Sequence, residues 1–141
     1  QIFYHQGLKM MRMKAWEKAE EFFRKAVQKD GSNVEMICNL GWSVFNNPKK
    51  KEPVRIEEAR SIWEQALKID GKDAQANYLM SLFYKTAKKT REQERHLQVA
   101  LDTKSDMVEA QREMRLLKMR AGKSGKEGSL LAKLFPSFVK K

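Results

Sequence analysis

The strongest constraint on the fold is a spaced pattern of small and large side chains that recurs along the chain. Each copy has a small or polar residue, a large apolar residue and an alanine at positions i, i+4 and i+7. The copies are Ala19-x3-Phe23-x2-Ala26, Ala59-x3-Trp63-x2-Ala66 and Gln93-x3-Leu97-x2-Ala100. Because these positions share one face of an α-helix, each copy predicts a helix that a neighbouring helix can approach closely.

A second helical pattern precedes each copy and has a small residue at its centre. These small residues are Gly7, Gly41 and Ser81. Ala66 and Ala100 are 34 residues apart, whereas Ala26 and Ala66 are 40 apart, since six additional residues lie inside the second unit. A helix pair of this kind cannot bury its apolar side alone, so the pairs are predicted to stack into a superhelix.

An Asp-Gly pair follows each of the first two copies, as Asp30-Gly31 and Asp70-Gly71. Glycine readily adopts the left-handed conformation that ends many helices, so each pair predicts the end of the second helix of a repeat. The helices that follow from these patterns are predicted near residues 1–12, 15–29, 33–46, 55–69, 73–88, 91–103 and 106–120.

This arrangement resembles the tetratricopeptide repeat (TPR), a 34-residue pair of antiparallel helices that stacks into a solenoid with a concave groove. The predicted fold class is therefore all-α, a tetratricopeptide-repeat helical solenoid of antiparallel helix pairs. The resemblance covers three repeats, at about 1–31, 32–71 with an inserted loop at 47–54, and 72–105. Residues 106–120 resemble the helix that caps such arrays, so the predicted repeat domain spans residues 1–120.

The chain departs from the family pattern in two places. Gly31 and Gly71 stand where the family usually has proline, and the turn tolerates this change. The third repeat is degenerate, because Gln93 and Leu97 replace the usual alanine and aromatic residue. The resemblance implies a scaffold or adaptor of the bacterial type, and a chain that opens with Gln1 is expected to be a piece of something longer.

Two further segments are predicted after the capping helix. Residues 121–129, AGKSGKEGS, predict a flexible linker because they are rich in glycine and serine. Residues 130–141 form an apolar and basic tail that is interrupted at Pro136. Its large apolar side chains recur at helical spacing: Leu130, Leu131, Leu134, Phe135 and Phe138. We expect this tail to occupy the groove of its own chain or of a second copy, which would give self-association; a disordered terminus and a basic membrane anchor are the alternatives.

The resemblance implies that the first helix of each pair lines the concave groove and binds a partner there. The partner-binding residues that it implies are Tyr4, Leu8, Met11, Cys38, Asn39, Trp42, Phe45, Tyr78 and Leu82. Large aromatic side chains anchor ligands well, because they bury much area at a small cost in entropy. The alternative, strongest for Leu8 and Leu82, is that several of these side chains belong to the core.

Some TPR domains hold the acidic C-terminal tails of heat-shock chaperones with a clamp of lysines, asparagines and an arginine. The matching positions in this chain are Tyr4, Leu8, Asn39, Gln75 and Leu79. Only the asparagine is retained, so the resemblance implies an apolar and aromatic groove without that clamp. The expected partner is a protein or peptide with an apolar segment.

The net charge leaves a second function open. Lysine and arginine number 29 against 18 acidic residues, which gives a net charge of +11. This balance also suits nucleic acid, an anionic membrane surface or an acidic protein partner. On the repeats, however, acids and bases interleave, as in Glu17-Lys18 and Arg24-Lys25, which predicts surface ion pairs rather than a basic stripe and disfavours nucleic acid. The basic loop Lys49-Lys50-Lys51 is interpreted as a solvated insert.

Enzyme chemistry is not predicted for this chain. The sequence has no metal-ligand spacing, nucleophile elbow or glycine-rich phosphate loop, and His5, His96 and Cys38 cannot supply a structural zinc set. We therefore expect no enzyme activity, no cofactor, no metal and no small-molecule substrate. A single cysteine and no secretory signal favour a cytoplasmic protein.

Overall fold

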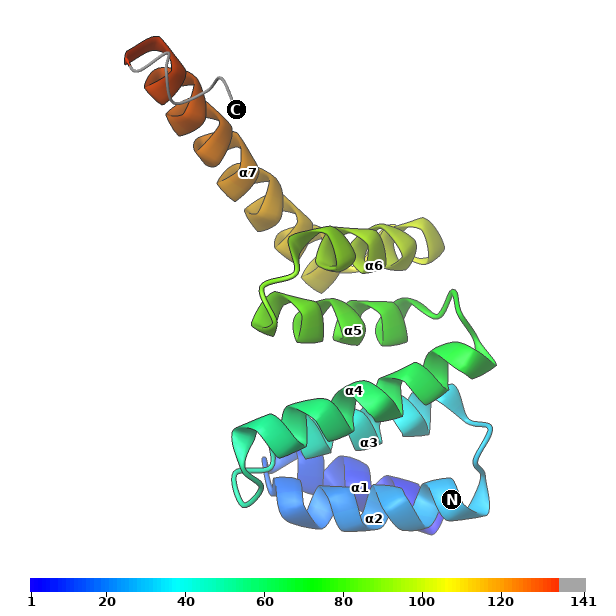
Figure 1. Ribbon diagram of the computed structural model, residues 1–141. Coiled ribbons are helices and arrows are strands. Elements are labelled where there is room, and N and C mark those ends of the chain that lie inside the picture. Colours follow the sequence, from blue (N-terminus) through cyan, green and yellow to red (C-terminus); the bar gives the residue numbers. More distant parts are fainter. Residues whose placement is uncertain (135–141) are drawn as a thin grey trace.

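The computed structural model describes the backbone of residues 1–134 and the side chains of residues 1–122. Helices make up most of the described chain, which contains no strand. They are α1 (Ile2–Arg12), α2 (Trp16–Lys29), α3 (Val34–Asn46), α4 (Glu52–Ile69), α5 (Ala74–Thr86), α6 (Thr90–Thr103) and α7 (Val108–Leu134). Successive helices stack as antiparallel pairs, with α1 and α2 at one end and α7 at the other (Figure 1). The predicted all-α solenoid of helix pairs is confirmed.

Close contact between small and large residues holds each pair together, as the repeat pattern predicted. Phe23 and Trp63 are fully buried. A Cβ atom added to Gly7 would lie 2.6 Å from Cδ1 of Phe23, and one added to Gly41 would lie 2.6 Å from Cδ1 of Trp63. The large ring of the second helix therefore occupies the recess that glycine leaves in the first helix. Leu97 takes the same place in the third pair and is also fully buried.

The buried apolar residues form two clusters. The larger cluster extends from α2 to α5 and includes Phe23 and Trp63. The smaller cluster joins α6 to α7 and includes Leu97 and Met114. Tyr78 on α5 is the only described side chain that packs on both clusters.

The ends of the second helices differ from the prediction. None of the described glycines has a positive φ, so the left-handed stop predicted at Gly31 and Gly71 is wrong. Asp30 and Asp70 instead leave the helix with φ near −142° and −141°, and the carboxylate of Asp70 accepts a hydrogen bond of 3.1 Å from the backbone N–H of Lys72. Aspartate side chains commonly accept such local hydrogen bonds from the backbone of a turn. Here the bond stabilises the turn after the helix without a glycine in the left-handed conformation.

The first helices of the second and third pairs have side-chain caps. Asn33 accepts a 3.0 Å bond from the N–H of Met36, and Asp73 accepts a 2.9 Å bond from the N–H of Ala76. Each bond satisfies one of the amide groups that the first turn of a helix leaves unpaired. The residues with positive φ are Lys14 and Lys88, in the short turns within the first and third pairs.

The inserted segment is shorter than predicted. Helix α4 begins at Glu52 rather than near residue 55, so the irregular loop ends at Lys51 and not at residue 54. Pro53 lies in the first turn of α4, where the missing N–H of proline costs nothing because that group has no partner within the helix. Part of the insertion therefore lengthens α4 to 18 residues, compared with 14 in α2.

The predicted flexible linker at residues 121–129 is also wrong at the level of secondary structure, because α7 continues through it to Leu134. Each glycine in a helix costs about 1 kcal/mol relative to alanine, but this segment contains no proline, and its lysines, glutamate and alanine favour helix. Within the residues that the structure describes, none of the helices combines the length and hydropathy that a membrane crossing needs.

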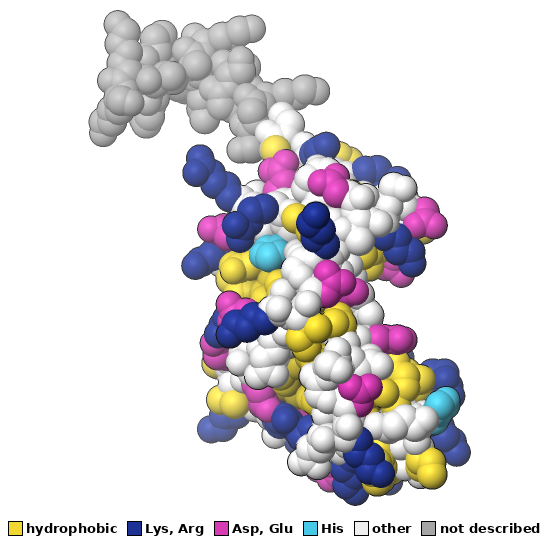
Figure 2. All heavy atoms as spheres, turned by 90° about the vertical axis from the view of Figure 1, so that its right-hand side faces the viewer, with side chains coloured by type: hydrophobic (Ala, Val, Ile, Leu, Met, Phe, Trp, Pro, Cys, Tyr) yellow, Lys and Arg dark blue, Asp and Glu magenta, His cyan; other side chains and the backbone are white. Residues whose placement is uncertain are grey.

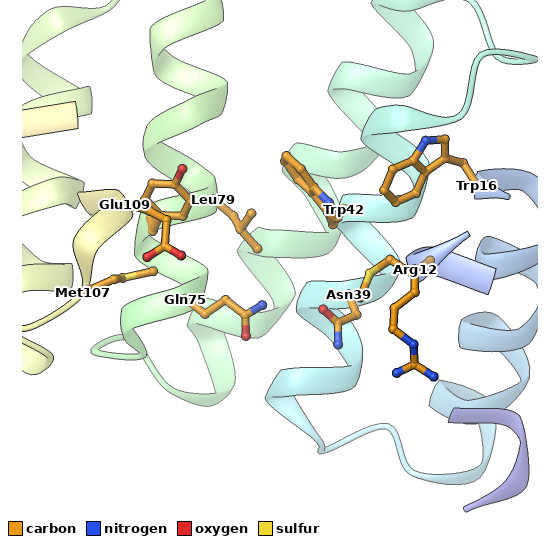
Figure 3. A pocket seen from close by; sticks show the side chains of 10 residues that line it. Arg12, Trp16, Asn39, Trp42, Gln75, Leu79, Met107 and Glu109 are labelled. Atoms are coloured by element: carbon orange, nitrogen blue, oxygen red, sulfur yellow. The ribbon is translucent and has the colours of Figure 1, made fainter. Parts of the chain in front are cut away.

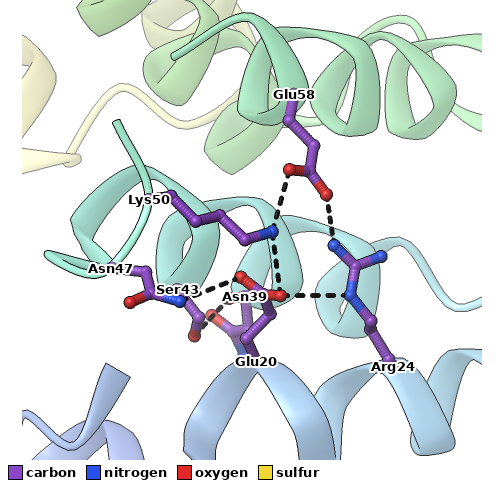
Figure 4. A network of polar contacts seen from close by, with 7 residues as sticks. All are labelled: Glu20, Arg24, Asn39, Ser43, Asn47, Lys50 and Glu58. Atoms are coloured by element: carbon purple, nitrogen blue, oxygen red, sulfur yellow. Dashed lines mark hydrogen bonds and ion pairs between the residues drawn. The ribbon is translucent and has the colours of Figure 1, made fainter. Parts of the chain in front are cut away.

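A polar network fixes the inserted loop to the second and fourth helices (Figure 4). The ammonium group of Lys50 lies 3.0 Å from Glu20 Oε2 and 2.9 Å from Glu58 Oε2. Arg24 contacts the same two carboxylates, and Asn47 Nδ2 donates a 3.4 Å bond to Glu20. Burial opposes the charge of Lys50, but the hydrogen bonds that its ammonium group donates to Glu58 and Glu20 outweigh this effect and raise its pKa. Lys50 is therefore a structural contact and not a solvated residue, which corrects that interpretation of the loop.

Replacing Lys50 with alanine is expected to destabilise the fold by about 1–2 kcal/mol, between the values for exposed and buried ion pairs, because Glu20 is largely buried and would lose a cation. Urea unfolding followed by circular dichroism measures the change. Lys51→Ala is the matched control, since Lys51 is exposed and forms no salt bridge with a described side chain. Equal stability of the two variants would show that the network does not hold the loop.

Candidate functional site

A cavity of about 480 Å³ opens on the side of the stack that the first helices of the pairs form. Helices α1, α3 and α5 contribute most of its lining, and the starts of α2 and α7 complete it (Figure 3). The lining residues are Met11, Arg12, Trp16, Asn39, Trp42, Gln75, Tyr78, Leu79, Met107 and Glu109. Four of the predicted partner-binding residues come together here: Met11, Asn39, Trp42 and Tyr78.

Trp42 is the largest apolar side chain at the centre of the cavity, and the residues behind it hold its ring in place. The Trp42 ring stacks on Phe45, with centroids 5.8 Å apart and planes inclined by 14°. The Phe45 ring lies 5.5 Å from that of Trp63, which belongs to the core. Phe45 was predicted to contact a partner, but it does not line the cavity. It stacks on Trp42, and contact of Phe45 with a partner stays a prediction.

Cys38 was also predicted to face a partner, and the structure places it in the core. Its side chain has no exposed surface, and its carbonyl oxygen accepts a 3.2 Å hydrogen bond from Nε1 of Trp63. Burial, followed by the charges of Asp73 and Glu35, raises the pKa of the thiol to about 12. Cys38 is therefore a protonated packing residue of the larger apolar cluster.

The other predicted groove residues lie beside the cavity without lining it. Tyr4, Leu8 and Leu82 are half-buried and pack on the larger apolar cluster, and contact of these side chains with a partner stays a prediction. Asn39 Nδ2 donates a 3.1 Å hydrogen bond to the hydroxyl oxygen of Tyr4. Burial, followed by Glu35, raises the pKa of Tyr4 to about 12, so this hydroxyl remains protonated at neutral pH.

The cavity is apolar at its centre and charged at its two ends. Figure 3 shows Arg12 on one side and Glu109 on the other, with Trp42 and Leu79 between them. Tyr78 has a raised pKa, caused first by burial and then by Glu113 and Glu109. A segment bound along this cavity would therefore meet a cation near α1 and an anion near α7.

Six of the lining residues were not among the predicted partner-binding residues. Gln75 and Leu79 were named only as positions that match the clamp, and Arg12, Trp16, Met107 and Glu109 were not named. Arg12 follows Leu8 by four residues, so helical spacing alone would have placed it on the same side of α1. Trp16 begins a second helix, and Met107 and Glu109 lie at the start of α7. Because only first helices were expected to line the groove, these three residues carried no signal.

The tail residues lie away from this cavity or outside the description. Leu130, Leu131 and Leu134 belong to the last turns of α7, which runs away from the stack (Figure 1). Phe135 and Phe138 lie outside the described residues. Occupation of the groove by the chain's own tail stays a prediction. Self-association through the tail of a second copy stays a prediction.

The described residues also bear on metal binding and on the role of His96. No three histidine, cysteine, aspartate or glutamate side chains among these residues gather closely enough to hold a metal ion. His96 shares a 2.9 Å hydrogen bond with Asn77 Oδ1, and its ring stacks on Tyr84. Burial, followed by Arg95, lowers the pKa of His96, so its ring is neutral in the folded domain at neutral pH. It lies outside the cavity, where it supports packing.

Comparison with known proteins identifies the architecture. No protein-family model matches the sequence, and no curated protein is similar to it in sequence. Among solved structures, the TPR domain of Arabidopsis OM64 is 19% identical and superposes with a TM-score of 0.73 over 84% of this chain and 93% of that chain. A thermophilic TPR protein from Thermus thermophilus is 16% identical, with a TM-score of 0.74 over 93% of this chain and 70% of that chain.

A third structure shows the same arrangement with a ligand. The second TPR domain of human RPAP3, in complex with an HSP70 peptide, SGPTIEEVD, is 19% identical and superposes with a TM-score of 0.68 over 82% of this chain and 92% of that chain. The chain has the tetratricopeptide-repeat fold. Its three TPR units are the pairs α1 and α2, α3 and α4, and α5 and α6, and α7 follows the last of them.

In this TPR domain, the positions that resemble the carboxylate clamp do not form one. Asn39, the retained residue, is 7% exposed and its amide already donates to Tyr4. Leu79 is 4% exposed and supplies an apolar wall, and Gln75 is neutral. Among the described residues, Arg12 is the one cation that lines the cavity.

Proposed function

We propose that this TPR domain is a non-catalytic interaction module of the scaffold or adaptor type, which binds an apolar peptide or helix of a partner protein in the cavity around Trp42 and Tyr78. The observation that carries the proposal is the joining of Met11, Trp42 and Tyr78, from three successive pairs, in one open cavity. Ligand sites of proteins are commonly concave and apolar, with a few polar groups that fix orientation. The peptide complex of the human RPAP3 domain supports the mode of binding, since that domain shares the fold.

The charges at the ends of the cavity define the partner more closely. Arg12 favours an acidic group at the α1 end of the bound segment, and Glu109 favours a basic group at the α7 end. The centre offers Trp42 and Leu79 to apolar side chains. We therefore expect a segment with an apolar middle and opposite charges at its two ends, in contrast to a ligand bound mainly through several carboxylates.

Trp42→Ala is expected to weaken binding of such segments at least tenfold, because a central aromatic anchor contributes well over 1 kcal/mol to most interfaces. Peptides would be selected on the wild-type domain from a phage-displayed library, and the affinity of each selected peptide would then be titrated by fluorescence anisotropy. The matched control is Val54→Ala, since Val54 is 59% exposed on α4 and does not line the cavity. Circular dichroism would establish that both variants are folded.

Two results would contradict the proposal. One is that the selected peptides bind Trp42→Ala and Val54→Ala with equal affinity. The other is that selected peptides show no apolar consensus and lose affinity only when Arg12 is changed, which would indicate an electrostatic ligand. Reversal of the end charges, through Arg12→Glu with Glu109→Arg, should favour peptides of the opposite charge order.

A further inference from the structure

Most charged residues of α2 separate onto two sides of the helix, with the exposed Glu21 between them, although the charges interleave in the sequence. Glu17 pairs with Lys49 at 2.7 Å, and Glu20 pairs with Arg24 and Lys50 at 3.3 and 3.0 Å. These pairs lie on the side of α2 that faces the inserted loop and α4. On the other side, toward α1, the helix presents Lys18, Lys25 and Lys29.

The lysines on that second side are exposed, and none of them forms a salt bridge with a described side chain. Two of them lie over aromatic rings. The ammonium group of Lys29 lies 4.9 Å from the ring centroid of Phe3, and that of Lys25 lies 5.5 Å from Phe3 and 5.9 Å from Phe22. These contacts hold the cations over an apolar floor that α1 and α2 share.

Helix α1 extends this surface with apolar and basic side chains. Ile2, Lys9 and Met13 follow one another at i, i+7 and i+11, on the side of α1 away from the cavity. Ile2 is 75% exposed and Met13 is 64% exposed. Because α1 and α2 form one end of the stack, no described element covers this side (Figure 1), and Figure 2 shows basic and hydrophobic side chains together at that end. We call this surface the basic end face, defined by Ile2, Lys9, Met13, Lys18, Lys25 and Lys29.

We propose that the basic end face binds the surface of an anionic phospholipid bilayer. The lysines would contact the lipid phosphates, and Ile2 and Met13 would enter the boundary between headgroups and acyl chains. Interfacial membrane-binding helices work in this way, since they combine a row of cations with a few exposed apolar side chains. The surface spans two helices held rigidly together, so membrane contact requires no folding of the segment that binds.

The alternatives fit the observations less well. A second copy of this face would bring lysine against lysine, and like charges at close range oppose association. Proteins that bind single-stranded nucleic acid stack bases on aromatic side chains, whereas the ammonium groups of Lys25 and Lys29 lie over Phe3. The exposed apolar side chains of Ile2 and Met13 would gain nothing by contact with the phosphate backbone of a nucleic acid, whereas they can enter the surface of a bilayer.

The test measures binding to vesicles of phosphatidylcholine mixed with phosphatidylserine, and to vesicles of phosphatidylcholine alone, by sedimentation at low and at physiological salt. The wild-type domain should bind only the mixed vesicles, and binding should weaken as salt rises. Each lysine near an anionic surface contributes roughly fivefold to binding, so Lys25→Gln with Lys29→Gln should reduce partitioning about 25-fold. The matched control is Lys68→Gln with Lys72→Gln, two exposed lysines that lie on other elements.

The two double variants have the same net charge of +9, since each loses two of the +11 charges. Loss of binding in the first with retention in the second supports the proposal. Equal loss of vesicle binding in both variants would show that binding depends only on the overall net charge, and this would overturn the proposal. A third variant, Ile2→Ser with Met13→Ser, should lose vesicle binding and leave binding to polyuridylate unchanged. Lysine-dependent binding to polyuridylate without binding to mixed vesicles would assign the basic end face to nucleic acid instead. Trp42→Ala should change neither vesicle binding nor polyuridylate binding.

Discussion

Trp63→Ala is expected to destabilise the domain by about 3–5 kcal/mol, the usual cost of removing a large buried aromatic side chain. The indole ring is fully buried between α3 and α4, where it fills the recess of Gly41 and supports Phe45. The substitution also removes the hydrogen bond from Nε1 to the carbonyl of Cys38. Since domains of this size are stable by only about 5–15 kcal/mol, the variant should unfold at markedly lower urea concentration, as measured by circular dichroism.

Trp63→Phe separates the two contributions. It keeps a ring at the site and loses the hydrogen bond and part of the packing, so we expect a smaller cost of about 1–2 kcal/mol. Phe23, which fills the equivalent place in the first repeat, shows that phenylalanine fits this position of the pattern. If Trp63→Ala were no less stable than Trp63→Phe, the ring would not be the support of the second repeat.

Gly41→Ala is expected to cost about 2 kcal/mol, although alanine favours helix by about 1 kcal/mol over glycine. The added Cβ would lie 2.6 Å from Cδ1 of Trp63, and α3 cannot withdraw because it is packed against both α2 and α4. The matched control is Gly71→Ala, where the nearest atom to the added Cβ is the carbonyl oxygen of Leu67 at 3.5 Å. That change should stay within about 0.5 kcal/mol of wild type.

A double-mutant cycle makes this prediction specific. In the Trp63→Phe background the smaller ring leaves room beside α3, so Gly41→Ala should cost less there than in the wild-type domain. Additive effects of the two changes would mean that Gly41 and Trp63 do not share a contact in solution. Gly7→Ala should cost less than Gly41→Ala, because α1 is an end helix and can shift away from Phe23.

The sequence was sufficient for the parts of the fold that depend on spacing along a helix. The small residues at Gly7 and Gly41 and the rings of Phe23 and Trp63 predicted which helices pair and how closely they approach. Within the groove, Trp42 and Tyr78 were found because they occupy the same side of successive first helices. Cys38 was misplaced because one step along a helix turns the side chain by about 100°, enough to move it from groove to core.

Features that depend on more distant neighbours were not predictable in this way. Lys50 was interpreted as solvated because nothing in the sequence links it to Glu20 and Glu58 across the inserted loop. Because Glu20 pairs with Lys50 and Arg24, it does not pair with Lys25 or Lys29. These two lysines, on the other side of α2, have no described carboxylate partner. Residues 121–129 looked flexible from their glycines, whereas helix α7, already formed ahead of them, continues through the segment.

Tyr78 belongs both to the packing of the core and to the lining of the cavity. It is the one described side chain that packs on both apolar clusters, and it also lines the cavity. A ligand bound in this cavity would contact Tyr78, the residue at which the two apolar clusters meet. The proposed binding site and the packing between the two apolar clusters therefore share one residue, Tyr78.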